Sequence, residues 1–76
     1  MPRITPIHWR RFEKILLLLG CHFIREEGDH RVYARDSLSS PLIVPRYNPL
    51  PVFIMRNNLR VLGVSHEEYL KLLARI

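Results

Sequence analysis

The chain has few of the residues that form cross-links, bind metals or cross membranes. Among its 76 residues there is one cysteine, Cys21, which cannot form a disulfide within the chain, and a small chain without cross-links fits a reducing cytoplasm. Cysteines or histidines in the spacing of a zinc site are also lacking. The longest apolar run, residues 15–19, is far shorter than the roughly 20 residues needed to span a bilayer. Charged residues such as Arg10 and Glu13 interrupt the apolar stretch that a signal peptide needs. We therefore expect one small cytoplasmic domain, spanning residues 1–76, with no metal, cofactor or membrane anchor.

The charge of the chain is strongly one-sided. Twelve basic residues face seven acidic ones, for a net charge of +5, and ten of the twelve are arginine. The guanidinium group binds phosphate through two parallel hydrogen bonds, so a phosphate-rich partner such as RNA is the first hypothesis. The alternative is that the arginines only keep a small protein in solution. Between residues 30 and 60 the one acidic residue is Asp36, which places the expected basic surface in this segment, with Arg31, Arg35, Arg46, Arg56 and Arg60.

Apolar residues three and four positions apart predict a first helix over residues 7–19. Thr5 followed by Pro6 resembles an N-cap with proline in the first turn, and Gly20 is the expected stop. Leu17 and Leu18 lie off the apolar stripe and are expected to face water. They are either a surface for a protein partner or ordinary exposed apolar residues.

A change of period after Gly20 predicts three strands in a meander. Residues 27–29 form a tight turn between two strands, residues 31–35 alternate, and residues 42–44 form a third strand closed by Pro45. A second helix is expected from Pro51 to Gly63, and Ser65 with Glu68 matches a capping box at the start of a third. The order αβββαα predicts an α+β sandwich in which helices cover one face of the sheet.

The alternation of the second strand assigns its two faces. If Val32 and Ala34 face the helices, His30 sits at the rim of the core side, while Arg31, Tyr33 and Arg35 form the open face. Such a face suits RNA, because cations meet phosphates and an aromatic ring stacks on a base. The alternative is a solvated face with one half-covered tyrosine, and a bulge after the turn would change the assignment.

Histidine is the side chain whose charge changes near neutral pH, and the chain has four. His8, His22 and His66 are expected to be structural; His8 lies where it could cover the end of the first helix. His30 differs because it follows the hairpin turn directly, between Arg25 and Arg31. It is therefore the candidate for proton transfer.

Short motifs along nearly the whole chain together resemble one known family. They are Pro6-Ile7, Leu19-Gly20, Arg25-Glu-Glu-Gly28-Asp29-His30, Val44-Pro45, Leu59-Arg60 and Gly63-Val64-Ser65. In order, spacing and total length these motifs resemble the HicA (YcfA-like) mRNA interferase toxins.

The resemblance implies a fold like that of double-stranded-RNA-binding domains, cleavage of mRNA without a metal, and a cognate HicB-like antitoxin. The essential histidine of the family corresponds to His30, which follows aspartate here where the family usually has serine. His30 would act as general acid or base, and a close Asp29 carboxylate would favour the acid role. The second proton is left to water, Tyr33 or another histidine. Leu17 and Leu18 are the expected antitoxin contacts, and the expected RNA contacts are Arg25, Arg31, Tyr33, Arg35, Arg46, Arg56 and Arg60.

Two other functions stay open at this stage. The substitutions around the turn, and the proline tract Pro49-Leu50-Pro51 where the family often has lysines, are also compatible with a degenerate toxin that binds RNA without cutting it. A protein-binding adaptor that uses Leu17 and Leu18 is the third hypothesis.

Overall fold

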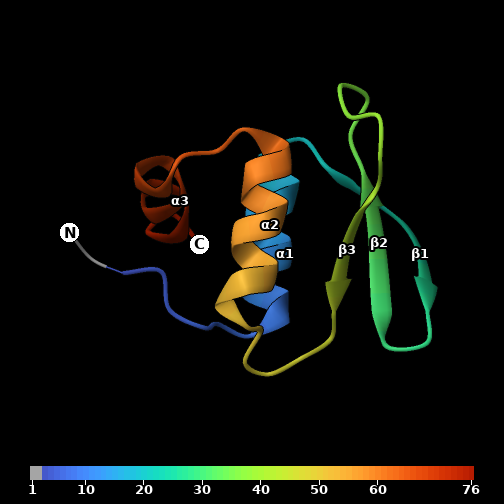
Figure 1. Cartoon of the computed structure of the whole chain (residues 1–76), viewed down its shortest axis with the longest axis horizontal. Helices are drawn as coiled ribbons and strands as arrows, with labels where there is room; N and C mark the ends of the chain where they lie inside the picture. The colour runs from blue at the N-terminus through green and yellow to red at the C-terminus, as the bar shows by residue number, and fades with distance from the viewer. Residues whose placement is uncertain (1–2) are drawn as a thin grey trace.

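Three helices and a three-stranded antiparallel sheet form the structure, in the predicted order, so the α+β assignment is confirmed (Figure 1). The structure is a computed structural model and describes residues 3–76. Its elements are α1 (Trp9–Leu18), β1 (His22–Glu27), β2 (His30–Ala34), β3 (Leu42–Pro45), α2 (Val52–Leu62) and α3 (His66–Leu73).

Helix α1 begins two residues later than the sequence predicts. Ile7 forms an isolated antiparallel bridge with Leu50, which keeps it extended, so the predicted N-cap at Thr5 is wrong. His8 caps the helix, because its Nδ1 atom accepts a hydrogen bond from the backbone N–H of Arg10 at 3.1 Å. Gly20 ends the helix as expected: with a φ of 87° it enters the left-handed region, which glycine adopts without steric cost.

The three strands pair in sequence order β1-β2-β3, which confirms the meander. Glu27 pairs with His30 across the two-residue turn Gly28-Asp29, and His30 pairs on its other side with Pro45. The register shifts between Phe23 and Arg25, so β1 contains a bulge at Ile24 rather than directly after the turn.

The expected face assignment of β2 is wrong. Tyr33 is fully buried in the core and Arg31 contacts Glu13 of α1, so the face that was expected to be open is the one that α1 covers. The bulge in β1 brings Phe23 onto this face, with its ring 5.9 Å from the ring of Tyr33. Tyrosine buries far more apolar surface than alanine, and its hydroxyl finds a partner in Glu13, which offsets the cost of burial. His30 consequently lies on the open face and not at the rim of the core side.

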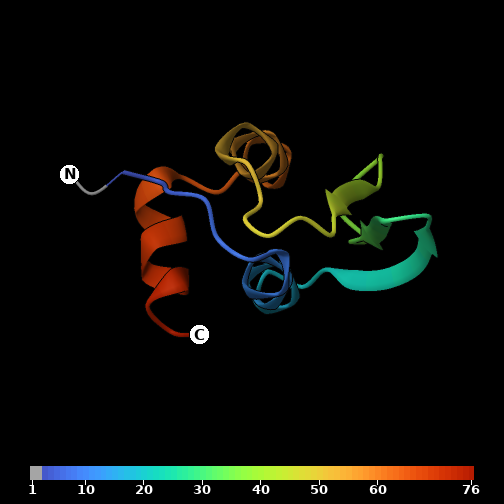
Figure 2. The ribbon, with the colours of Figure 1, turned by 90° about the horizontal axis from the view of Figure 1, so that it is seen from below.

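The helices lie on different parts of the sheet. Helix α1 covers the Tyr33 face, and α2 runs beside the edge strand β3, as the view from below shows (Figure 2). Asn58 of α2 donates from Nδ2 to the carbonyl oxygen of Ile43 at 3.3 Å, which satisfies an acceptor at the free edge of β3. Helix α3 packs against α1, away from the sheet.

One hydrophobic core joins the helices, the sheet and the N-terminal segment. Phe12, Ile15 and Leu16 are fully buried, as the apolar stripe of the first helix predicts, and Tyr69 anchors α3 to them. Within residues 3–76, no helix combines the length and the apolar character required to cross a membrane.

Candidate functional site

His30 projects from a rigid position at the tip of the β1–β2 hairpin. It is the first residue of β2, and Gly28 makes the preceding turn possible because its φ of 62° favours glycine. The side chain is 48% exposed, so a ligand can reach the ring. Asp29 places Oδ1 3.1 Å from Nδ1 of His30, so the carboxylate that the sequence placed nearby does lie close. When Nδ1 carries the proton that this carboxylate accepts, Nε2 of the neutral ring keeps its lone pair for another partner.

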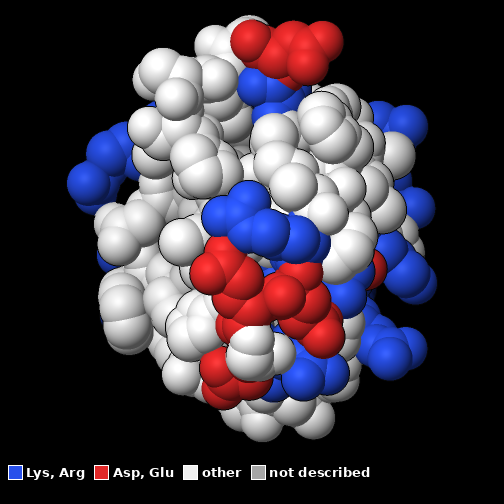
Figure 3. Space-filling model, turned by 90° about the vertical axis from the view of Figure 1, so that its right-hand side faces the viewer, with Lys and Arg blue, Asp and Glu red and all other residues white. Residues whose placement is uncertain are grey.

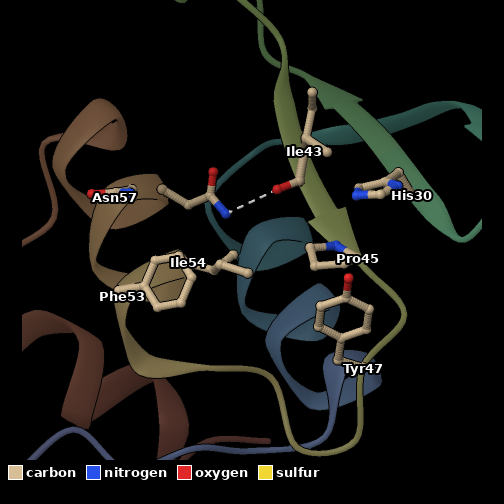
Figure 4. A pocket seen from close by; sticks show the side chains of 8 residues that line it. His30, Ile43, Pro45, Tyr47, Phe53, Ile54 and Asn57 are labelled. Carbon is tan, nitrogen blue, oxygen red and sulfur yellow. Dashed lines mark hydrogen bonds between the residues drawn. The ribbon is translucent and has the colours of Figure 1, made fainter.

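A groove of about 370 Å³ opens beside His30, between the open face of the sheet and α2 (Figure 4). We call it the His30 groove. In Figure 4, His30, Ile43, Pro45 and Tyr47 form the wall on the side of the sheet, and the side chains of α2 form the other wall. The lining residues are His30, Ile43, Pro45, Tyr47, Phe53, Ile54, Asn57 and Asn58.

Backbone hydrogen bonds hold the segment that carries Tyr47. The carbonyl oxygen of Tyr47 accepts from the N–H of Trp9 at 3.2 Å, and the Tyr47 N–H donates to Pro45 at 2.8 Å. The N–H of Arg46, the residue before Tyr47, donates to the carbonyl oxygen of Asp29 at 2.8 Å, which ties the segment to the hairpin turn. The wall of the groove is therefore fixed by the start of α1 and by the turn that carries His30.

The arginines of the hairpin are paired with glutamates. Arg25 lies 2.6 Å from Glu27, and the Nε atom of Arg46 lies 3.6 Å from Glu26, which Arg31 also contacts at 2.9 Å. Figure 3 shows the result on this side of the molecule, where acidic and basic groups alternate over one patch. Of the basic surface that the sequence predicts, Arg31 and Arg46 are thus paired with Glu26 of β1. Of the paired arginines of β1 and β2, Arg25 shares the open face with His30 and Arg31 does not.

Arg31 is held inside the protein rather than offered to a ligand. Its side chain is 20% exposed and lies 3.0 Å from Glu13. The guanidinium carbon also lies 4.0 Å from the centre of the Phe23 ring and 5.2 Å from that of Trp9. A hydrogen bond with Tyr33, above all, keeps the pKa of Arg31 above its ordinary value.

Tyr33 belongs to the same cluster. Its hydroxyl donates to Glu13 and accepts from Nε of Arg31 at 3.0 Å. Burial, followed by the hydrogen bond with Glu13, raises the pKa of Tyr33 to about 12. Since the ring is fully buried on the α1 side, it cannot stack on a base while the core is intact.

The remaining predicted contacts lie on other parts of the surface. Arg35 donates to the carbonyl oxygen of Leu19 at 3.1 Å and to Ser37 at 2.8 Å. Arg56 and Arg60 of α2 line a second hollow of about 330 Å³, separate from the His30 groove. The expected antitoxin contacts of α1 are exposed as predicted, to 50% for Leu17 and 45% for Leu18.

The sequence analysis missed the α2 side of the groove and Tyr47. Phe53 and Asn57 stand four residues apart and off the apolar stripe of their helix, so they share a second face of it. An exposed phenylalanine on that face was the available signal. Among residues 3–76, no three histidine, cysteine or carboxylate side chains are grouped so as to hold a metal ion.

Comparison with models of known protein families gives a match. A family model described as "HicA toxin of bacterial toxin-antitoxin" matches residues 9–64, which run from the start of α1 through the hairpin and the groove to the end of α2. No curated protein and no solved structure matches the chain.

Proposed function

The chain belongs to the HicA toxin family of bacterial toxin-antitoxin systems, and on that premise we propose that it is an endoribonuclease that cleaves mRNA without a metal, with His30 as general acid or base. The observation that carries the proposal is the placement of His30. Its ring is half exposed on a fixed strand end, has Asp29 at Nδ1, and borders a groove. Histidine titrates in the range where proton transfer at neutral pH is most efficient.

The cleavage step moves two protons. A base removes the proton of a ribose 2′-hydroxyl, the oxygen attacks the adjacent phosphorus, and the departing 5′-oxygen takes up a proton as the P–O bond breaks. Nε2 of His30 is the atom that takes or gives a proton, because Asp29 holds the ring through Nδ1, as a carboxylate orients a catalytic histidine elsewhere.

Burial of Tyr33 on the opposite face removes one of the three candidates for the second proton. His8, His22 and His66 do not line the groove, so a second histidine finds no support there. The one other titratable side chain that lines the groove is Tyr47, whose hydroxyl points toward Pro45 and the side of His30 in Figure 4. Water or Tyr47 therefore supplies the second proton in this proposal.

The proposed phosphate contacts divide into two groups. Arg25 and Arg46 flank the hairpin turn and are half exposed, so they can exchange a glutamate for a phosphate. Arg56 and Arg60 contact RNA further along the strand, from α2. The fold of the hairpin depends on Arg31, Arg35 and Tyr33, which therefore contribute to RNA binding only indirectly.

His30→Ala tests the proposal. Cleavage of RNA by the purified protein is expected to fall by about 10²–10⁴-fold, the usual contribution of one acid or base, and induced expression should no longer arrest growth. Thermal unfolding should hardly change, since the ring is half exposed. His22→Ala is the matched control: this exposed histidine lies at the other end of the hairpin and should leave cleavage intact. Full cleavage by His30→Ala would refute the role.

A module that binds RNA without cutting it is the second candidate, and the ion pairs of the hairpin favour it. Each arginine near His30 is held by a glutamate, which leaves less free positive charge for the phosphorane than a fast nuclease uses. Binding that weakens with salt and intact RNA after long incubation would support this candidate.

Membership of a toxin-antitoxin family gives the chain an antitoxin partner. We propose that Leu17 and Leu18, at the C-terminal end of α1, belong to the surface that the HicB-like antitoxin covers.

A further inference from the structure

The His30 groove combines features that a nucleobase requires. Two aromatic side chains line it and are accessible, Tyr47 at 42% and Phe53 at 66% exposure. Ile43 and Ile54 add apolar surface, and Asn57 adds an amide with a donor and an acceptor. A volume of about 370 Å³ lies at the small end of the range for ligand pockets.

We propose that the His30 groove binds one unpaired nucleobase of the RNA, next to the phosphodiester bond whose cleavage His30 assists by proton transfer. The inference rests on the proposed ribonuclease function and gives it a substrate requirement: the base must be free of both pairing and stacking. Bases of RNA are read in this state, stacked on aromatic rings and hydrogen-bonded at their edges, because the edges are hidden in a duplex.

The position of the groove relative to the charges supports a base rather than a phosphate. Its lining residues include no arginine, lysine, aspartate or glutamate, so His30 in its protonated form is the one lining side chain that could offer a phosphate a positive charge. Arg46, however, follows directly after Pro45 of the groove wall, and Arg56 lies on the same helix as Phe53 and Asn57. A nucleotide chain can thus place its base in the groove and its phosphates outside, toward these arginines.

The walls of the groove are held before any ligand arrives. Asn58, which is 8% exposed, ties α2 to the edge of β3 through its bond to Ile43, and Trp9 holds Tyr47 through the backbone. A preformed site loses less free energy to ordering on binding. His30 and the groove are therefore presented to the RNA as one rigid unit.

The occupant that competes with a base is an apolar side chain of the antitoxin. The amide of Asn57 and the imidazole of His30 argue against it, because a purely apolar side chain would leave these polar groups without new partners. The exposed leucines at the C-terminal end of α1 offer the antitoxin an apolar surface that is separate from the residues lining the groove.

Binding of a short unstructured RNA with 2′-O-methyl groups tests the inference without cleavage. Fluorescence anisotropy at low salt is measured with the unaltered chain, Tyr47→Ala and Phe53→Ala. Each variant is expected to weaken binding by about 5- to 150-fold, the effect of losing one stacking contact. Val61→Ala is the matched control, since Val61 is 53% exposed on the same helix but does not line the groove. Circular dichroism of each variant checks the fold, and Phe53→Ala is expected to fold like the unaltered chain because Phe53 is exposed.

A second arm identifies the base. A set of RNAs is compared in which each member lacks the base at one position. For one of these positions, the affinity of the unaltered chain for the abasic RNA should be as low as the affinity of Phe53→Ala for the intact RNA. At that position the two losses should not add, because both remove the same contact. The duplex of the same sequence should bind at least as weakly as the abasic RNA.

The outcomes separate this inference from the ribonuclease proposal. Equal RNA affinity of Phe53→Ala, Tyr47→Ala and the unaltered chain overturns the nucleobase site, even if the chain cleaves RNA. If these variants instead lose only antitoxin binding, the groove is a protein contact. Loss of RNA binding in the variants, with no cleavage by the unaltered chain, keeps the base site and refutes the nuclease. Absence of RNA binding by the unaltered chain overturns both.

Discussion

Removing the hydroxyl of Tyr33 tests whether the buried face of β2 is structural. Tyr33→Phe keeps the ring, which is fully buried, and deletes an oxygen that bonds to Glu13 and to Nε of Arg31. A hydrogen bond to a charged group is worth about 1.5–3 kcal/mol. We expect the free energy of unfolding to fall by the amount for one such hydrogen bond and not for two, because Arg31 stays 3.0 Å from the Glu13 carboxylate after the hydroxyl is gone.

A loss of this size is large for a chain of 76 residues. Domains of this length are stable by roughly 4–11 kcal/mol, so the variant should remain folded at 25 °C. Its midpoint of thermal unfolding should fall by roughly 6–24 °C. Urea unfolding followed by circular dichroism measures the change in free energy of unfolding directly, provided that the slope with urea stays the same.

Two further measurements make this prediction specific. In a double-mutant cycle, Glu13→Gln and Tyr33→Phe should be less than additive by about 0.5 kcal/mol or more, since they share one contact. RNA affinity, measured well below the unfolding midpoint, should not change, because the hydroxyl does not reach the open face. A change below about 0.5 kcal/mol would show that the hydroxyl is not engaged. A folded Tyr33→Phe with weakened RNA binding would show that our assignment of the two faces is wrong.

Other changes probe the core, the edge of the sheet and the antitoxin surface. Burial raises the pKa of Tyr69 from 10.0 to about 12. The neutral side chain therefore contributes its full stability below pH 10, and this contribution is lost as the pH rises toward 12. Between pH 10 and pH 12, the free energy of unfolding in urea should depend less on pH for Tyr69→Phe than for the unaltered chain. Asn58→Leu leaves the carbonyl oxygen of Ile43 without its side-chain donor and should destabilise the fold by about 1–3 kcal/mol in the same assay, with Val61→Leu as the control. Leu17→Ser with Leu18→Ser should weaken capture by the antitoxin at least tenfold, measured by calorimetry, and leave RNA cleavage unchanged.

The order of elements could be predicted because local signals mark their ends. Gly20 and Gly63 both adopt positive φ at the ends of helices, and Ser65 accepts a hydrogen bond from the N–H of Glu68 as half of the expected capping box. Such signals act within a few residues and need no knowledge of the rest of the chain. The start of α1 was not predictable in this way, since the pairing that delays it joins Ile7 to Leu50.

The faces of β2 illustrate what alternation leaves open. A period of two separates Val32 from Tyr33 but does not say which residue faces the helices, and both are buried. Val32 is covered on the open face, where it lies between Arg25 and Ile43 of the neighbouring strands. Contacts with Glu13 of α1 and a bulge at Ile24 determine that Tyr33 faces the helix, and the sequence has no local signal for this bulge.

His30 was chosen as the candidate because of the family resemblance and its place after a turn, whereas the sequence did not predict the groove beside it. The groove needs β2, β3, the segment before α2 and α2 itself to meet, so its residues are distant in sequence. The sequence analysis did not single out Tyr47 or Phe53, which only the fold places around one hollow.

The net charge predicts that RNA is attracted, but the arrangement of the charges decides where it binds. The arginines near the hairpin turn form ion pairs with Glu13, Glu26 and Glu27, whereas no ion pair among residues 3–76 involves Arg56 or Arg60. Free positive charge is therefore stronger on α2 than at the hairpin, although the proposed catalytic residue lies on the hairpin. The groove lies between the two, and a strand drawn to α2 by its phosphates can reach His30 through one base in the groove. Few phosphates are then neutralised, so the affinity for RNA should fall only modestly with salt, and the base contact should supply much of the binding that remains.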